Sequence, residues 1–403
     1  MLSGALFHAL KPTVVFSTPG LTPSSPTCYC SSSKLNRTMA SSSSSVRIVV
    51  VGDVHDDWDL QDDSKALELL QPDLVLFTGD FGNENVELVR SIAALKIAKA
   101  AILGNHDAWN TQNFSEKRKD AVQIQLESFR KEHVGYQRLD FHPLKLSVLG
   151  GRPFSCGGER FFRKQLLAKR YGVHNMNESA KRISDAALGT PKNHSIILLA
   201  HNGPTGLGSN MNDICGRDWV REGGDHGDPD LALAISQLKG NTQYSVPLVV
   251  FGHMHKELAF GNGPRKMIVV GDDNTIYLNG AIVPRVKRFR DNTLSEDPKR
   301  TSRAFTLIEY KVKVVVHHHP TMLKGEMNTL KAKGMAGQIY LGEWLINIPV
   351  DCGVGATPYI LSFGSVFTSI NCTSEIYIFF RFMYHLIMHF VCSYQMTPDL
   401  DPS

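Results

Sequence analysis

Residues 47–55 read RIVVVGDVH, and this stretch decides the fold. Its first five residues, Arg47–Val51, form a short apolar run that is too short for a helix and typical of a buried β-strand. A glycine, an aspartate and a histidine follow soon after the run ends. The same arrangement, an apolar run followed at once by a loop with polar residues, recurs four times further along the chain. These further runs are Leu74–Phe77, Ala100–Leu103, Ser195–Leu199 and Leu248–Phe251.

Segments with helical character lie between these predicted strands. One opens with Asn175 and Glu178 at the spacing of a capping box. Another opens with Asp228 as its N-cap and Pro229 at the first helical position. The alternation of strands and helices predicts an α/β fold. The predicted helices are Lys65–Leu70, Val86–Leu95, Ser115–His133, Asn175–Leu188 and Asp228–Lys239.

Each predicted strand ends in a loop that carries oxygen or nitrogen donors. The loops read GDVH (52–55), GDFGN (79–83), GNHD (104–107), AHNG (200–203) and GHMH (252–255). In open α/β sheets the ligand site lies beyond the carboxyl ends of the strands, so these loops are expected to meet in one crevice. Donors without a thiolate suit Mn, Fe or Zn, and this number of donors suits two ions that share a carboxylate. The candidate ligands are Asp53, His55, Asp80, Asn105, His201, His253 and His255.

The order of these motifs resembles the calcineurin-like metallophosphoesterase superfamily. The pattern of that superfamily is D-x-H, G-D-x-x-[DN], G-N-H-[DE], H and G-H-x-H, and every element is present between Val46 and Tyr310. The resemblance implies a four-layer α/β/β/α sandwich with two central sheets and helices outside. It also implies a hydrolase of phosphomonoesters or phosphodiesters that uses two divalent metal ions (Mn, Fe or Zn) and attack by a metal-bound hydroxide.

The resemblance also implies roles for individual residues. Asp80 bridges the two metals. His106 stabilises the transition state or protonates the leaving oxygen, and Asp107 orients His106. Asn83 matches the second polar position of its motif. The ligands of the first metal are Asp53, His55 and His255. The ligands of the second metal are Asn105, His201 and His253.

The composition is that of a soluble globular protein. The chain has 403 residues, of which 42% are hydrophobic and 20% charged. Lys and Arg number 43 against 39 Asp and Glu, and this net charge of +4 disfavours both a nuclease and an acidic disordered chain. No nucleic-acid partner is therefore expected. The 7 cysteines are scattered and include no C-x-x-C pair, which fits neither a disulfide framework nor a thiolate zinc site.

The two ends of the chain differ from its middle. Residues 1–45 contain no Asp or Glu and are rich in Ser and Thr, as in a disordered transit peptide. The scarcity of arginine favours the chloroplast. The alternatives are a merely disordered N-terminus or a true start at Met39, and a mitochondrial or cytoplasmic location. Residues 317–403 form an atypical tail of uncertain fold. Its apolar run Ile376–Tyr394 contains Arg and His, so no membrane partner is expected. Residues 46–316 are then the metallophosphoesterase domain.

The sequence leaves the substrate open. A small-molecule phosphoester and a phosphoprotein both fit, because the metal motifs carry the reaction type only. The alternative function is a binding or scaffold protein of the same fold without catalysis, although every ligand and His106 are retained. The acidic loop between Asp213 and Asp230 is expected to be mostly solvated and could roof the site. Arg152 could contact phosphate. The oligomeric state is open.

Overall fold

The computed structural model describes residues 45–260, 263–288, 301–311, 338–348 and 361–364. The predicted leader, apart from Ser45, lies outside these residues, as does most of the predicted tail, including the apolar run Ile376–Tyr394. Within the part of the chain that is described, no helix is both long enough and apolar enough to cross a membrane.

The first of two central β-sheets holds the N-terminal strands. Its members are β1 (Ser45–Val51), β2 (Leu74–Phe77), β3 (Lys99–Ala101), β10 (Val286–Arg288), β11 (Thr301–Lys311), β12 (Gln338–Ile348) and β13 (Leu361–Gly364). Their order is β13-β12-β11-β1-β2-β3, and β10 also pairs with β11. Because β1, β2 and β3 run parallel, their carboxyl ends lie at one edge of the sheet.

The second sheet is built by the middle of the chain. Its members are β4 (Arg138–Phe141), β5 (Leu146–Gly150), β6 (Ser195–Leu199), β7 (Leu248–Phe251), β8 (Ile268–Val270) and β9 (Ile276–Asn279). Their order is β4-β5-β6-β7-β9-β8, and β6 and β7 are parallel neighbours. All five strands expected from the sequence are therefore present. Two of them differ in their bounds. β1 begins two residues earlier than predicted, and β3 begins one residue earlier and ends two residues earlier.

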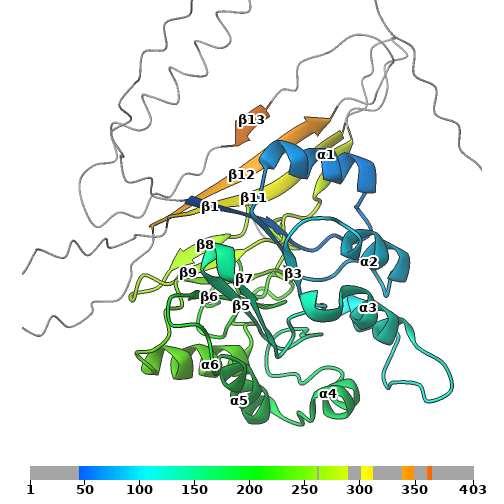
Figure 1. The fold of residues 1–403 in the computed structure, drawn as a ribbon, viewed down its shortest axis with the longest axis vertical. Helices are drawn as coiled ribbons and strands as arrows, with labels where there is room; N and C mark the ends of the chain where they lie inside the picture. The colour runs from blue at the N-terminus through cyan, green and yellow to red at the C-terminus, as the bar shows by residue number, and fades with distance from the viewer. Residues whose placement is uncertain (1–44, 261–262, 289–300, 312–337, 349–360, 365–403) are drawn as a thin grey trace, which may run out of the picture. The chain divides into compact units, whose positions relative to one another are not determined.

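Helices cover the outer faces of both sheets. Figure 1 shows α1 to α3 and α4 to α6 on different sides of the strands. The helices are α1 (Leu60–Leu70), α2 (Val86–Ala93), α3 (Ala121–Phe129), α4 (Lys164–Tyr171), α5 (Met176–Ala186) and α6 (Pro229–Gly240). Short 3-10 turns span His106–Ala108, Arg130–Glu132 and His142–Leu144.

The core divides along the two faces of each strand. Ile48 and Val50 on β1 join an apolar cluster with residues of β6 and β7, which fills the space between the sheets. Val49 and Val51 point the other way, into the cluster that includes the buried faces of the helices. This period of two is that of a strand buried on both sides. The predicted four-layer α/β/β/α sandwich is confirmed.

The helices differ from expectation in three places. Helix α1 begins at Leu60, five residues before the predicted start at Lys65, because the Asp59 side chain caps it by accepting the backbone N–H of Asp62. The helix predicted to start at Ser115 begins only at Ala121, because Asp120 and Gln123 form a reciprocal capping box there. Helix α4 was not predicted at all. Its eight residues begin without a side-chain cap at Arg163 and include four cations or amides between the few apolar positions, so neither a start signal nor a clear period is present.

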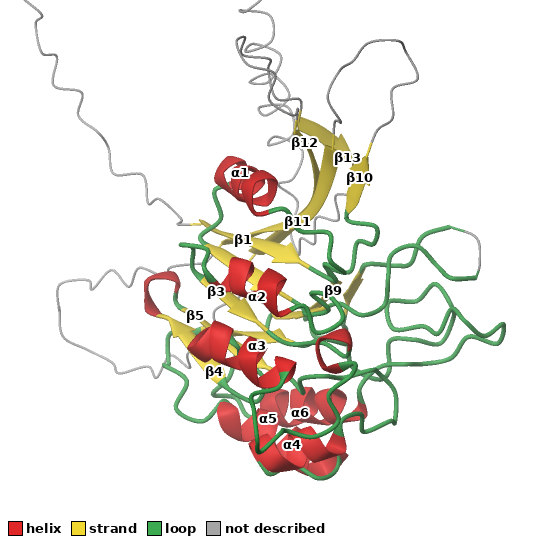
Figure 2. Ribbon diagram, turned by 90° about the vertical axis from the view of Figure 1, so that its right-hand side faces the viewer, coloured by secondary structure: helices red, strands yellow, loops and turns green. Residues whose placement is uncertain are grey.

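The first sheet continues into the segment that was expected to be an atypical tail. Strand β12 pairs antiparallel with β11 from Gln338 to Ile348, and β13 pairs with β12. Figure 2 shows these strands together at the edge of the sheet, beside β10. The sequence did not predict either strand. The proposed limits of the domain, 46–316, stay a prediction.

Candidate metal centre

The loops after β1, β2, β3, β6 and β7 bring the predicted ligands together at the carboxyl ends of the two sheets. Several of these residues adopt a backbone conformation that is unusual for residues with a side chain. The φ angle is +45° at Asp53, +42° at His55, +51° at Asp80 and +67° at His253. Such strained residues cluster at functional sites, where the surrounding structure holds them in place. Four of the candidate ligands therefore adopt a conformation that the surrounding structure has to maintain.

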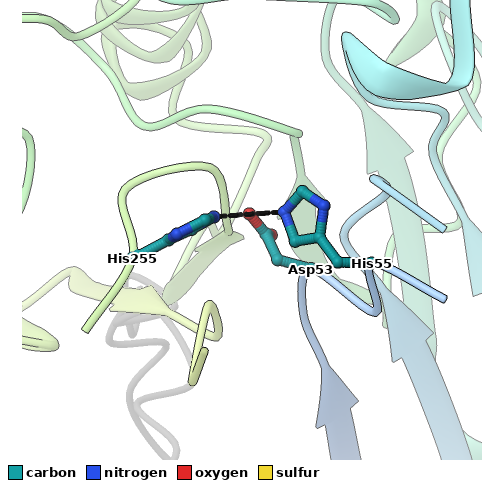
Figure 3. A group of neighbouring side chains, drawn as sticks. All are labelled: Asp53, His55 and His255. Atoms are coloured by element: carbon teal, nitrogen blue, oxygen red, sulfur yellow. Dashed lines mark hydrogen bonds and ion pairs between the residues drawn. The ribbon is translucent and has the colours of Figure 1, made fainter. Parts of the chain in front are cut away.

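The first cluster consists of Asp53, His55 and His255, whose donor atoms lie within 4.8 Å of one another. Figure 3 shows the Asp53 carboxylate between the two imidazoles. Asp53 Oδ2 is 3.5 Å from His255 Nε2 and 4.0 Å from His55 Nε2. The two Nε2 atoms are only 3.1 Å apart, so at most one proton fits between them. Three lone-pair donors thus converge on one point.

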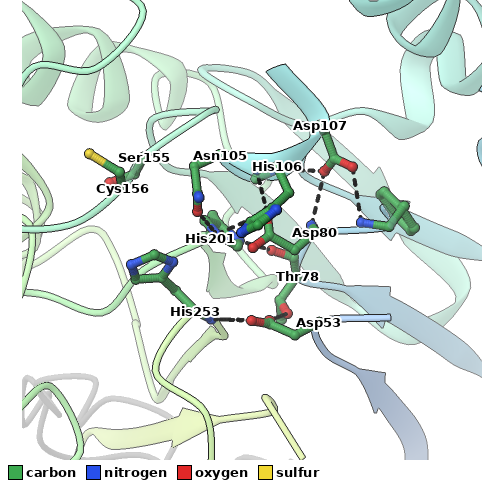
Figure 4. A network of polar contacts seen from close by, with 12 residues as sticks. Asp53, Thr78, Asp80, Asn105, His106, Asp107, Ser155, Cys156, His201 and His253 are labelled. Atoms are coloured by element: carbon green, nitrogen blue, oxygen red, sulfur yellow. Dashed lines mark hydrogen bonds and ion pairs between the residues drawn. The ribbon is translucent and has the colours of Figure 1, made fainter. Parts of the chain in front are cut away.

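The second cluster consists of Asp80, His201 and His253. Asp80 Oδ1 lies 3.4 Å from His201 Nε2, and Asn105 Oδ1 lies 2.9 Å from the same nitrogen. His201 Nδ1 donates to the carbonyl of Thr78 at 2.7 Å, which leaves Nε2 as the nitrogen that faces the cluster. The side chains of Asp80, Asn105, His201 and His253 appear together in Figure 4.

Asp80 also connects the two clusters. Its Oδ2 atom lies 3.9 Å from His55 Nε2, whereas its Oδ1 atom faces His201. Each carboxylate oxygen is therefore directed to a different cluster. This is the arrangement expected of a carboxylate that bridges two metal ions.

The buried carboxylates of the site favour the binding of a cation. Burial acts to raise the pKa of Asp80, but the charge and hydrogen bond of His201, together with the charges of His106 and His253, hold that pKa below its usual range. Burial likewise disfavours the charged form of His201, yet Asp80 raises the pKa of His201 to about 10. Asp80 thus depends on a protonated histidine for charge compensation. A divalent ion would supply that charge instead, so the donor set fits the metal that the motifs imply.

Glycines in the loops allow the donors to approach the backbone. A Cβ atom at Gly104 would lie 2.2 Å from Asp80 Oδ1 and 2.4 Å from His201 Cε1. A Cβ atom at Gly252 would lie 2.2 Å from Asp53 Oδ1. Any side chain at either position would therefore displace a candidate ligand, which is the physical reason for glycine there.

His106 lies beside both clusters, but its partner is not the one that the sequence suggested. His106 Nδ1 is 2.6 Å from Asn83 Oδ1. The Asp107 carboxylate instead accepts the backbone N–H groups of Gly104, Asp80 and Phe81 at 2.7 to 2.9 Å. Figure 4 shows Asp107 on the far side of Asp80 from the histidines. The prediction that Asp107 orients His106 is therefore wrong. Asn83 holds the ring, and Asp107 ties two ligand loops together.

The loop between β6 and α6 also differs from expectation. Asp218 and Asp230 were expected to be mostly solvated, but both are buried, and so is Asp228, the predicted helix cap. Asp228 occupies the N-cap position of α6 without a side-chain cap, because its carboxylate binds Arg152 at 2.9 Å. Arg152 is fully buried in this ion pair and in a second one with Asp230. It is therefore not placed to contact a phosphate.

Sequence reasoning missed three rings that surround the site. His226 lies in the loop before α6 and stacks on His253, with ring centroids 5.9 Å apart. Trp219 contacts the edge of His226, and Trp109 stacks on His106. No motif contains these residues. The only signal was position, since Trp109 follows the GNHD motif within two residues and Trp219 and His226 lie in the loop after His201.

Four other histidines of the described residues, His133, His142, His174 and His194, stand apart from both clusters. His133 is buried, and its Nε2 accepts the backbone N–H of Leu103 at 3.2 Å. His142 and His194 contact each other edge to face, and His174 pairs with Glu178. These contacts are structural.

Comparison with known proteins identifies the family of the chain. Residues 46–257 match the calcineurin-like phosphoesterase family, and the chain belongs to this family. Solved structures with remote similarity include a dimetal phosphatase from Danio rerio, at 10% identity and a TM-score of 0.31, with 65% of this chain and 95% of that chain covered. A conserved protein from Streptococcus pneumoniae, described as a predicted phosphoesterase, has 9% identity and a TM-score of 0.24, with 67% and 87% covered. The curated proteins include no significant match.

Proposed function

We propose that the chain is a phosphoesterase that depends on two divalent metal ions and hydrolyses phosphomonoesters or phosphodiesters. The observation that carries this proposal is the position of Asp80, whose two carboxylate oxygens face different donor clusters. Asp53, His55 and His255 would hold one ion. Asp80, Asn105, His201 and His253 would hold the other, with Asp80 shared.

The metal ions would supply Lewis acidity, which lowers the pKa of water toward neutrality and neutralises charge on the phosphoryl oxygens. The protein supplies the remaining chemistry through His106. Its Nδ1 is engaged by Asn83, so Nε2 is the nitrogen left to hold or deliver a proton at the leaving oxygen. Asp107 acts at a distance, because it binds the backbone of the loops that carry Asp80 and His106.

Replacement of His106 tests this role. His106→Ala is expected to lower kcat for an activated phosphoester by about 10²- to 10⁴-fold, the usual contribution of a general acid. The measurement is steady-state hydrolysis of p-nitrophenyl phosphate and bis-p-nitrophenyl phosphate by the full chain, stripped with chelator and reloaded with Mn²⁺. The preferred ester also decides between a monoesterase and a diesterase.

The exposed His174 offers a matched control, because it pairs only with Glu178 on the surface. His174→Ala is expected to keep the wild-type rate. A folded, metal-loaded wild-type protein that turns over neither ester would instead support the alternative of a binding protein without catalysis. Equal rates for wild type and His106→Ala would remove His106 from the reaction.

Metal binding is also expected to stabilise the fold. Without a cation the buried Asp53 and Asp80 carboxylates lie close to each other, and their charge is compensated only by histidines. At a free Mn²⁺ concentration of about 100 times Kd, linkage predicts about 2.7 kcal/mol of added stability. Thermal unfolding of the chelated and the Mn²⁺-loaded protein measures the difference. An unchanged Tm on loading would contradict a preformed metal centre.

A further inference from the structure

Two tryptophans at the metal centre are exposed although tryptophan is usually among the more buried side chains. Trp109 is 50% exposed and Trp219 is 44% exposed. Each lies directly against a histidine of the candidate site. A large ring that stays exposed to water beside a site lacks the hydrophobic stabilisation that burial would give it. The position of both rings at the same site therefore points to a ligand that covers them.

Trp109 is held in a fixed orientation beside the first cluster. Its ring stacks on His106 at 4.8 Å between centroids and 10° between planes, and His106 in turn lies 4.9 Å from the His55 ring. Arg163 donates hydrogen bonds to the carbonyls of Ala108 and Trp109, which fixes the backbone of this turn. The indole is thus one ring away from the residue proposed to protonate the leaving group.

Trp219 has the equivalent position beside the second cluster. It contacts His226 edge to face, with centroids 4.7 Å apart. His226 stacks on His253 at an interplanar angle of 23° and its Nε2 lies 2.8 Å from the Cys156 carbonyl, which fixes its orientation. A chain of contacting rings therefore connects each exposed tryptophan to one of the two donor clusters.

We propose that Trp109 and Trp219, one beside each donor cluster, offer stacking faces for an aromatic ring carried by the phosphoester, and we call these faces the stacking subsite. The preferred substrates are then esters with a ring the size of a nucleobase, such as nucleoside phosphates, and not aliphatic phosphoesters. The chemistry is that of stacking, in which any base offers a π-face and alanine substitution removes most of the contact. This inference rests on the proposed phosphoesterase function and adds its substrate class.

The test compares esters with and without a ring, in the full Mn²⁺-loaded chain. The monoester pair is AMP and glycerol 3-phosphate, and the diester pair is the dinucleotide ApA and diglycerol phosphate. For each substrate, kcat/KM of the variant is divided by that of the wild type, so intrinsic reactivity cancels. Trp109→Ala and Trp219→Ala are expected to lower the ratio for the ring-bearing ester by about 5- to 100-fold and for the ring-free ester by less than about twofold.

Two further variants separate stacking from a structural effect. Trp109→Phe keeps an aromatic face and is expected to recover most of the loss for the ring-bearing ester. Leu188→Ala removes an apolar side chain that is 67% exposed on the surface, and is expected to change neither ester. An equal loss for both esters in Trp109→Ala would mean that Trp109 only positions His106, and would overturn the subsite. A ratio near one for both esters in Trp109→Ala and in Trp219→Ala would also overturn the subsite.

Binding of adenosine gives a readout that needs no turnover. Quenching of the intrinsic tryptophan fluorescence is expected to saturate with adenosine in the wild type, and Trp109→Ala is expected to raise the Kd by at least about fivefold. A wild type that hydrolyses no ester would overturn the proposed function but not the stacking subsite. Saturable adenosine binding that weakens in Trp109→Ala would then still support the subsite. Unsaturable quenching that Trp109→Ala leaves unchanged would overturn the subsite even in an active enzyme.

Discussion

Asp80→Asn is expected to lower phosphoester hydrolysis by more than about 10³-fold, because bound divalent ions contribute several kcal/mol of transition-state stabilisation and Asp80 is the carboxylate proposed to bind both. The two oxygens of Asp80 are not equivalent. Oδ1 accepts the backbone N–H of His106 at 2.9 Å and faces His201, whereas Oδ2 faces His55. An amide preserves one oxygen and its size but removes the negative charge that both clusters share.

Metal content and rate should therefore fall together in Asp80→Asn. Metal analysis after dialysis is expected to give two equivalents of Mn²⁺ for the wild type and at most one for the variant. Asp73→Asn is the matched control, because Asp73 precedes the same strand at its opposite end, is exposed and binds only the backbone of Arg47. Full metal content with full activity in Asp80→Asn would exclude a bridging role for Asp80.

The sequence predicted the centre of this molecule because the relevant signals are local. A strand of four or five apolar residues ends at a glycine or a small residue, and a donor follows within one to four positions. Parallel pairing then brings together the carboxyl ends of β1, β2 and β3 in one sheet, and of β6 and β7 in the other. Asp53 and His255 follow strands of different sheets, so their meeting depends also on how the two sheets pack. The sequence indicated that packing only through the resemblance to a known family.

The predictions that were wrong concern contacts with no local signal. Asp107 is adjacent to His106 in the chain, yet the short turn at His106–Ala108 directs its carboxylate back to the backbone of Asp80 and Phe81. Asp228 does occupy the N-cap position that the sequence predicted, but its carboxylate makes no cap hydrogen bond. Its actual partner, Arg152, lies 76 residues earlier, and nothing in the local sequence of either residue indicates the other. Burial decides such pairs, and burial is a property of the whole fold.

That buried arginine gives the second large expected effect. Arg152→Leu is expected to lower the free energy of unfolding by about 3–5 kcal/mol, the usual penalty for removing one partner of a buried ion pair. Arg152 Nε donates to Asp230 at 2.8 Å and Nη2 donates to Asp228 at 2.9 Å, with all three side chains at most 2% exposed. Leucine leaves the two carboxylates buried together without a cation. Urea denaturation with excess chelator measures the loss. The control is Arg90→Leu on the surface of α2, for which the free energy of unfolding is expected to fall by less than about 1 kcal/mol.

The loss in Arg152→Leu should also depend on pH, and the direction follows from Asp228. Burial raises the pKa of Asp228 to about 6 in the wild type, although Arg152 opposes that rise. A carboxyl whose pKa is higher in the folded state contributes most below its unfolded pKa, and its contribution falls as the pH rises through the folded pKa. Removal of Arg152 raises the folded pKa further, so the penalty continues to grow at higher pH. The variant should therefore lose more stability at about pH 8 than at about pH 5, where a proton replaces the missing cation. Asp228→Asn in the Arg152→Leu background is expected to recover part of the loss at about pH 8, whereas a pH-independent penalty would mean that lost packing, and not an uncompensated charge, destabilises the fold.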